Sequence, residues 1–100
     1  MQKERKLADS VELPYDTVIV EKLQSNHNNV PRICQGSLST NPIRIGHGLH
    51  VSGDLGITTT PIKEIEMLDD GGVKCVTRNS TYVIYNRETY TKKVTISDIR

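Results

Sequence analysis

The chain has 100 residues, which is enough for one modest hydrophobic core and too few for a core plus a separate catalytic domain. Its net charge of +1 gives no global attraction to nucleic acid or anionic membranes, so any electrostatic argument has to be local. The sequence has no Phe or Trp, four Tyr and a single Ala, and its apolar residues are mainly Ile, Val and Leu. Because β-branched side chains pack well on pleated sheets, this composition favours a mostly β protein.

Membrane and secretory signals are weak in this sequence. No apolar run approaches the roughly 18 residues of a spanning helix, and the basic N-terminal residues are not followed by an apolar segment. Cys34 and Cys75 fit reduced, buried thiols better than a disulfide framework. We therefore expect a cytoplasmic protein with no membrane partner.

The first third of the chain predicts a tail followed by two strands. Residues 1–10 are dense in charge and predict a flexible or short helical tail, which leaves 11–100 as a single small β domain. The Val-Ile-Val centre of 15–23 predicts a strand, and the polar run 24–29 predicts a loop. A second strand is expected over 30–35, where Pro31 favours an edge position or the strand entry.

A third strand is expected over 43–52, where apolar residues alternate and glycines permit a bend in the middle. The segment from Gly36 through Ile43-Arg44-Ile45-Gly46 to Leu49 and Val51 resembles the second, β-barrel domain of translational GTPases over about sixteen residues. The resemblance implies a closed or nearly closed barrel and carries no function.

The segment 60–70 matches two templates. Thr60 as N-cap, Pro61 at the first helical position and the spacing of Ile62, Ile65 and Leu68 fit a helix. The preceding threonines and the Asp-Asp-Gly-Gly link after it fit a strand that enters a hairpin, and we favour the strand. Alternation over 92–99 predicts a closing strand.

The stretch 73–86 predicts an antiparallel hairpin with a two-residue turn at Asn79-Ser80, in which Val76 faces Val83. Strict alternation then sorts its residues into two faces. The face expected to be core carries Val73, Cys75, Thr77, Tyr82, Ile84 and Asn86. The other face carries Lys74, Val76, Arg78, Thr81, Val83 and Tyr85. Together these elements predict an all-β fold with at most one short helix, arranged as a five- to seven-stranded antiparallel barrel or half-open sheet.

The sequence contains no motif that is typical of a metal site or of a catalytic site. His47 and His50 are three residues apart, so in an extended strand they point to opposite faces and do not ligate one ion unless the region of Gly46 and Gly48 turns sharply. We expect no metal and no cofactor. No GxSxG elbow is present, and we assign no catalytic residue. An enzyme would need His47 or Cys75 in a pocket with a partner base, built between subunits.

The second face of the hairpin is the leading candidate for a binding surface. An apolar pair with cations and an aromatic ring around it is typical of a protein or subunit contact. The predicted function is a non-enzymatic binding module that acts through protein contacts or self-association. The alternative is intrachain cover, by a helix from the N-terminal residues or by the segment that begins at Thr60, together with charge pairing to the acidic stretch 64–70. The predicted contact set is Lys74, Val76, Arg78, Val83 and Tyr85.

A second function is nucleic-acid or nucleotide binding by a small barrel. Cations that follow phosphates and aromatic rings that stack on bases are the ingredients of a single-strand platform. An accessory protein of a phage or mobile element is one setting for such a partner. The predicted nucleic-acid face is Arg78, Tyr82, Tyr85, Arg87, Lys92 and Lys93.

Overall fold

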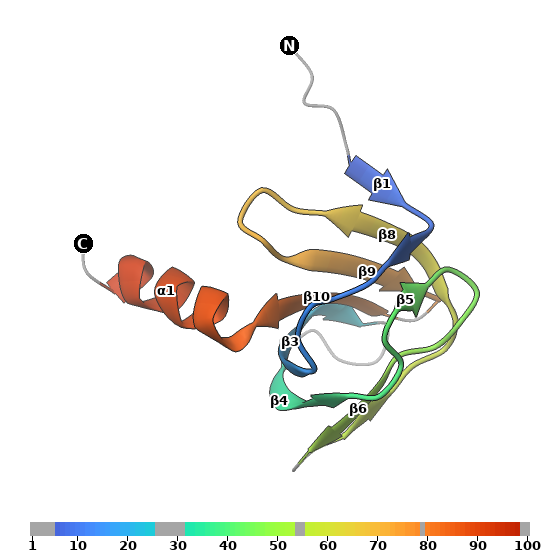
Figure 1. The fold of residues 1–100 in the computed structure, drawn as a ribbon, viewed down its shortest axis with the longest axis horizontal. Coiled ribbons are helices and arrows are strands. Elements are labelled where there is room, and N and C mark those ends of the chain that lie inside the picture. The colour runs from blue at the N-terminus through green and yellow to red at the C-terminus, as the bar shows by residue number, and fades with distance from the viewer. Residues whose placement is uncertain (1–5, 26–31, 54–55, 79, 99–100) are drawn as a thin grey trace.

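The computed structural model describes residues 6–25, 32–53, 56–78 and 80–98 (Figure 1). It is predominantly β with one helix, which confirms the predicted fold class. In chain order the elements are β1 (Lys6–Ala8), β2 (Ser10–Val11), β3 (Thr17–Ser25), β4 (Arg32–Leu38), β5 (Ile43–Arg44), β6 (His50–Gly53), β7 (Ile57–Thr58), β8 (Ile62–Met67), β9 (Val73–Thr77), β10 (Ser80–Asn86) and α1 (Arg87–Asp98).

Eight strands form one antiparallel sheet in the order β1-β8-β9-β10-β3-β4-β6-β7, and β2 pairs with β5 in a separate ladder. The sheet does not close into a barrel, so β1 and β7 are its two edges. Of the two predicted architectures the half-open sheet is therefore the observed one, with eight strands instead of five to seven. The closed barrel implied by the resemblance to the GTPase domain is not formed.

One face of the coiled sheet carries the core. In Figure 1 β8 lies near the top of the molecule and β6 near the bottom, and side chains from both belong to the same buried cluster. Ile43 of the β2–β5 ladder and Leu13, which follows β2, are buried in it as well. The cluster consists of Leu13, Val18, Val20, Leu38, Ile43, Leu49, Val51, Ile62, Ile65, Val73, Cys75, Tyr82 and Ile84. Cys34 and Cys75 are both buried free thiols, as predicted.

The segment 45–49 connects β5 and β6 and binds to the start of β8. Ile45 forms a parallel bridge with Ile62. The Gly46 N–H donates to the Ile62 carbonyl at 2.8 Å, and the Ile62 N–H donates to the His47 carbonyl at 3.0 Å. These bonds tie the connection between β4 and β6 to the opposite half of the open sheet.

The predicted long strand over 43–52 is wrong, because a turn divides it into β5 and β6. The His47 N–H donates to the Arg44 carbonyl at 3.2 Å, and Gly46 has φ +88° at the third position of this turn. A positive φ at that position is typical of a type II turn and favours glycine. The glycine bend was correctly placed, but it reverses the local chain direction, and His47 is exposed.

The segment 60–70 matched both a helix and a strand, and the strand that we favoured is the observed form, since β8 covers Ile62–Met67. Pairing with β9 on one side and β1 on the other stabilises the extended form. A tight loop then follows, in which the Leu68 N–H donates to the Gly72 carbonyl at 2.9 Å. Gly71 in this loop has φ +92°.

The hairpin of β9 and β10 has the predicted faces but a different register. Val76 pairs with Thr81 instead of Val83, and Cys75 pairs with Tyr82 instead of Ile84. β9 ends at Thr77 and β10 begins at Ser80, so the turn lies one residue earlier than predicted. The Thr77 hydroxyl bonds across it, because it donates to the Ser80 carbonyl at 3.0 Å and accepts from the Ser80 N–H at 3.2 Å. A shift of two residues keeps every side chain on its face. The predicted core face is therefore confirmed, with Asn86 half-buried at its end.

The predicted closing strand over 92–99 is wrong, because this part of the chain belongs to α1. The Asn86 side-chain oxygen accepts from the Glu88 N–H at 3.0 Å, which makes Asn86 the N-cap. Glu88 lies in the first turn, where a negative charge interacts favourably with the helix dipole. The helix leaves the sheet at the end of β10 and projects away from it (Figure 1). It is not long and apolar enough to cross a membrane, and it is the one helix in the described part of the chain.

The N-terminal segment is extended where the structure describes it. Lys6–Ala8 form β1 and pair with β8, so these residues are neither helical nor a free tail. Tertiary pairing overrides the weak local preference of this charged stretch. The rest of the predicted tail, 1–5, lies outside the described residues.

Candidate functional site

The face of the sheet opposite the core carries a row of side chains that crosses six strands. Cross-strand pairs link them in the order Leu7, Glu66, Lys74, Val83, Glu21 and Ile33. We call this set the outer row. Its two ends, Leu7 and Ile33, are 57% and 52% exposed, whereas Val83 at its centre is 1% exposed. The accessible apolar surface of the outer row therefore lies at its ends.

The predicted contact set is only partly accessible, because Val83 and Tyr85 are 1% and 2% exposed. The loop between β8 and β9 covers them. A Cβ added at Gly72 would lie 2.7 Å from Val83 Cγ1 and 2.8 Å from Tyr85 Cε1. The Tyr85 hydroxyl donates to Asp70 Oδ2 at 3.2 Å, and its ring packs against Tyr90 of α1 at a centroid distance of 5.5 Å. Intrachain cover thus occurs at these two residues, but the loop and α1 supply it instead of the segments expected.

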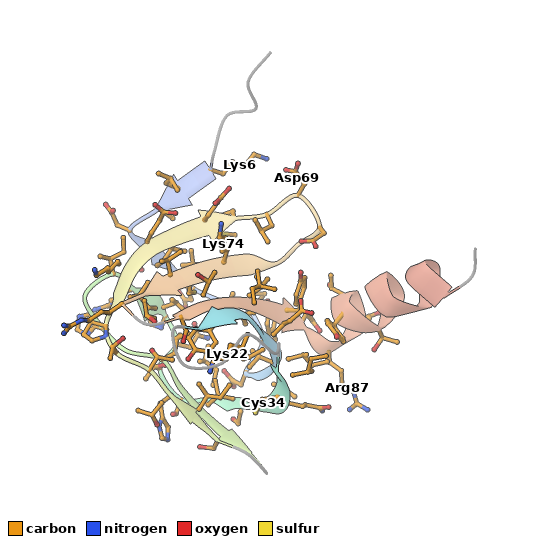
Figure 2. All side chains as sticks on the ribbon, turned by 180° about the vertical axis from the view of Figure 1, so that it is seen from behind. Lys6, Lys22, Cys34, Asp69, Lys74 and Arg87 are labelled. Atoms are coloured by element: carbon orange, nitrogen blue, oxygen red, sulfur yellow. The ribbon has the colours of Figure 1, made fainter. Side chains whose placement is uncertain are left out.

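The remaining members of the contact set lie on the outer face as predicted. Lys74 Nζ lies 3.8 Å from Glu66 Oε1, so the acidic strand and the basic hairpin do pair across the sheet. Lys74 is labelled in Figure 2, which shows the molecule from behind. Val76 is half-buried, and Arg78 is exposed just after β9. A second, exposed pair joins Lys6 and Asp69 at 3.9 Å. Pairs of this kind contribute at most about 1 kcal/mol each.

The predicted nucleic-acid face is not brought together. Tyr82 lies in the core cluster and Tyr85 on the opposite face of β10, so the two rings do not form one stacking platform. Arg78 follows β9 at the turn of the hairpin, whereas Arg87 and Lys92 lie on α1 beyond the other end of β10. The side chain of Lys93 lies outside the described residues.

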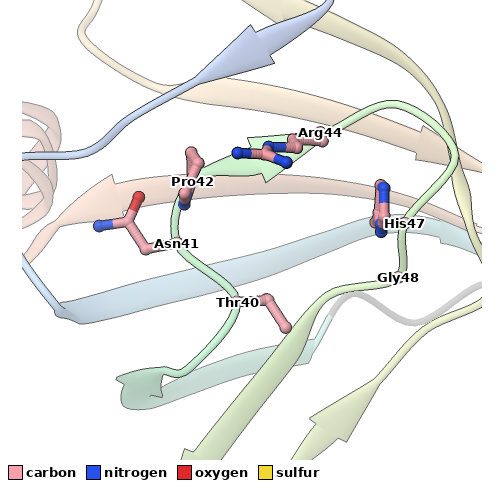
Figure 3. A pocket seen from close by; sticks show the side chains of 6 residues that line it. All are labelled: Thr40, Asn41, Pro42, Arg44, His47 and Gly48. Atoms are coloured by element: carbon pink, nitrogen blue, oxygen red, sulfur yellow. The ribbon is translucent and has the colours of Figure 1, made fainter.

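A pocket of about 410 Å³ lies in the connection between β4 and β6 (Figure 3). Its lining consists of Thr40, Asn41, Pro42, Arg44, His47 and Gly48. Volumes of roughly 300–1,000 Å³ are usual for sites that bind small molecules. The turn described above places Arg44 and His47 three residues apart at its two ends. In Figure 3 the Arg44 side chain extends towards Pro42, and the His47 ring lies apart from it.

Hydrogen bonds to the rest of the fold fix the walls of this pocket. The Asn41 side chain accepts from the Leu13 N–H at 3.0 Å and donates to the Leu13 carbonyl at 2.9 Å. The Thr40 hydroxyl accepts from the His50 N–H at 3.1 Å. On the far side, the Leu49 N–H donates to Thr59 Oγ1 at 2.9 Å. The pocket is therefore part of the folded framework.

The side chains of Arg44 and His47 are the chemically distinctive part of the lining. Both residues are exposed, and neither side chain forms an ion pair or hydrogen bond within the described part of the chain. None of the described residues that line the pocket carries a carboxylate. Within that set, the lining presents an arginine and an imidazole with no acidic partner.

Metal and thiol chemistry have little support in the described residues. Among them, no group of three or more His, Cys, Asp or Glu side chains is close enough to hold a metal ion. His50 Nδ1 lies 3.0 Å from Thr58 Oγ1, away from the His47 side of the turn. Burial raises the pKa of the Cys75 thiol to about 12, which disfavours a reactive thiolate.

Sequence reasoning named His47 as a pocket residue only for an enzyme and missed Thr40, Asn41, Pro42, Arg44 and Gly48. The available signal was the turn chemistry on both sides of β5, an Asn-Pro step before it and Gly-His-Gly after it. Comparison with family models, with curated proteins and with solved structures found no match. The function has to be argued from these residues alone.

Proposed function

We propose that the chain is a small, non-enzymatic, cytoplasmic binding module that works through protein contacts, and that its partner is a second copy of itself. The observation that carries the proposal is Leu7, an apolar side chain 57% exposed on the edge strand β1. β1 pairs with β8 on one side, and on its other side no strand in the described part of the chain pairs with it. Open strand edges are templates for pairing with another chain. Two buried free thiols agree with a reducing compartment.

Two copies of β1 can pair antiparallel about Leu7. Opposed residues of an antiparallel pair point to the same face, so a two-fold axis at the centre places Leu7 of one copy opposite Leu7 of the other on the outer face. The two exposed leucine side chains then form an apolar contact at the centre. This arrangement has two-fold symmetry and closes after two copies, as in most homodimers.

The proposed class of function is the one predicted from the sequence, a binding module, but the proposed contact is β1 instead of the hairpin of β9 and β10. Val83 and Tyr85 are interior residues, so they support the sheet instead of touching a partner. Lys74 lies two strands from β1 in the outer row, beside Glu66. These residues flank the proposed contact on the same face. For the nucleic-acid alternative, the separation of Tyr82 and Tyr85 removes its supporting observation, and we do not propose it.

Sedimentation velocity over a range of protein concentrations tests this proposal. The unmodified chain is expected to reach the mass of a dimer, and Leu7→Glu is expected to remain monomeric because it places like charges at the centre of the contact. Ile33→Glu is the matched control, since Ile33 is 52% exposed at the opposite end of the same outer row. A monomer at every concentration would refute the proposal, as would dissociation by Ile33→Glu with no effect of Leu7→Glu.

A further inference from the structure

We propose a second binding site, the pocket lined by Arg44 and His47, which takes the oxyanion group of a small molecule, either a phosphate or a carboxylate. This inference does not rest on the proposed self-association, because it concerns different residues. Arg44 and His47 lie in the connection between β4 and β6, whereas the proposed dimer contact is β1.

Charge selects the class of ligand. An arginine side chain presents planar N–H donors in a fork that matches a carboxylate or a phosphate, and an imidazole supplies an N–H donor in either protonation state. Among the described lining residues both groups are present and there is no carboxylate. Neither side chain is bonded to another described residue, so a ligand would not have to break a contact with these residues. A cationic ligand has no acidic partner among the described lining residues.

The backbone positions these two donors in advance. The bond from the His47 N–H to the Arg44 carbonyl closes the turn, and Gly46 supplies the positive φ that the turn requires. The Gly46 and Ile62 bonds then fix this turn to β8. Because the framework is already ordered, binding loses little conformational entropy apart from that of the two side chains.

The size of the pocket indicates more than a bare ion. A volume of about 410 Å³ exceeds that of a phosphate or carboxylate group and falls in the range of small-molecule sites. Pro42 gives the wall an apolar surface. Gly48 permits the close approach of the Thr59 backbone, since a Cβ there would clash with the Thr59 carbonyl oxygen. The oxyanion would face Arg44 and His47, and the rest of the molecule would contact Pro42.

Two-dimensional NMR of the ¹⁵N-labelled chain at low ionic strength tests the proposal. Three probes are titrated separately: inorganic phosphate, succinate and adenosine monophosphate, with sodium chloride as the control for non-specific ionic effects. We expect saturable shifts concentrated at the amides of 44–48 with at least one probe. Comparison of phosphate with succinate identifies the preferred oxyanion, and adenosine monophosphate tests whether a larger body increases the affinity.

Substitutions then assign the binding to these side chains. Arg44→Ala is expected to weaken binding about tenfold through loss of a charge-assisted hydrogen bond. Arg78→Ala is the matched control, because it removes the same charge from an exposed arginine outside the pocket. Leu7→Glu is expected to leave binding unchanged, which separates this site from the proposed dimer contact.

Three results would overturn the inference. The first is the absence of saturable shifts with all three probes. The second is a response to sodium chloride equal to the response to the probes. The third is equal weakening by Arg44→Ala and Arg78→Ala, which would mean that the protein attracts anions only through its overall charge.

Discussion

Truncation of Val83 tests whether this residue is buried within the chain or belongs to a contact between chains. Val83→Ala removes two carbon atoms from a side chain that is 1% exposed. Each buried CH₂ contributes about 0.8 kcal/mol, and the cavity left behind adds to the loss. We therefore expect the free energy of unfolding to fall by roughly 2–3 kcal/mol. For a domain of this size, that lowers the melting temperature by about 10–20 °C.

Thermal and urea unfolding followed by circular dichroism measure this change. Val76→Ala is the control, because Val76 lies on the same face of the hairpin and is half-buried. Its expected cost is about 1 kcal/mol or less. If Val83→Ala is as mild as Val76→Ala and instead lowers the mass in sedimentation, then Val83 belongs to a contact between chains and the burial argument fails.

Three further predictions follow from individual contacts. Asn41→Ala removes both hydrogen bonds to Leu13 and is expected to lower the free energy of unfolding by about 1–3 kcal/mol, measured in urea; an unchanged midpoint would contradict it. Gly72→Ala places a Cβ 2.8 Å from the Tyr85 ring and is expected to cost about 1–3 kcal/mol, and a melting temperature equal to that of the unmodified chain would show that the loop moves freely. Burial raises the pKa of Cys75 from 9.0 to about 12, so above pH 9 the thiol ionises more readily in the unfolded chain. Stability should therefore fall as pH rises from 9 towards 12, by up to about 1.4 kcal/mol per pH unit, and Cys75→Ala should flatten this decline; equal slopes in the two proteins would contradict the burial effect.

The hairpin shows which features of a β structure can be predicted from one sequence. Face assignment depends only on a period of two, so it was correct even though Val76 pairs with Thr81 and not with Val83. Register depends on the position of the turn, which lies one residue earlier than predicted, where the Thr77 hydroxyl bonds to Ser80. The composition rule for the fold class succeeded for a related reason, because the preference of β-branched residues for strands does not depend on the register.

Prediction failed where the decisive partner was distant or where one side chain changed the element. The C-terminal alternation suggested a strand, but the Asn86 cap begins a helix directly after β10. The outer face was expected to contact a partner or to be covered by the N-terminal residues or the segment that begins at Thr60, yet Gly72 and Asp70 from the loop before β9 cover Tyr85. The pocket depends on Asn41 and its bonds to Leu13, which no local pattern connects.

The loop that contains the pocket supports the fold mainly through its backbone, and two of its side chains, Arg44 and His47, are not used for that support. The connection between β4 and β6 reaches the start of β8 through backbone bonds of Gly46 and His47, and Ile43 completes the core. The side chains of Arg44 and His47 take no part in these contacts within the described residues. Arg44→Ala should therefore change the free energy of unfolding by no more than about 0.5 kcal/mol, the range of ordinary surface substitutions. A variant that folds normally and binds an oxyanion weakly would place the role of Arg44 in recognition and outside folding.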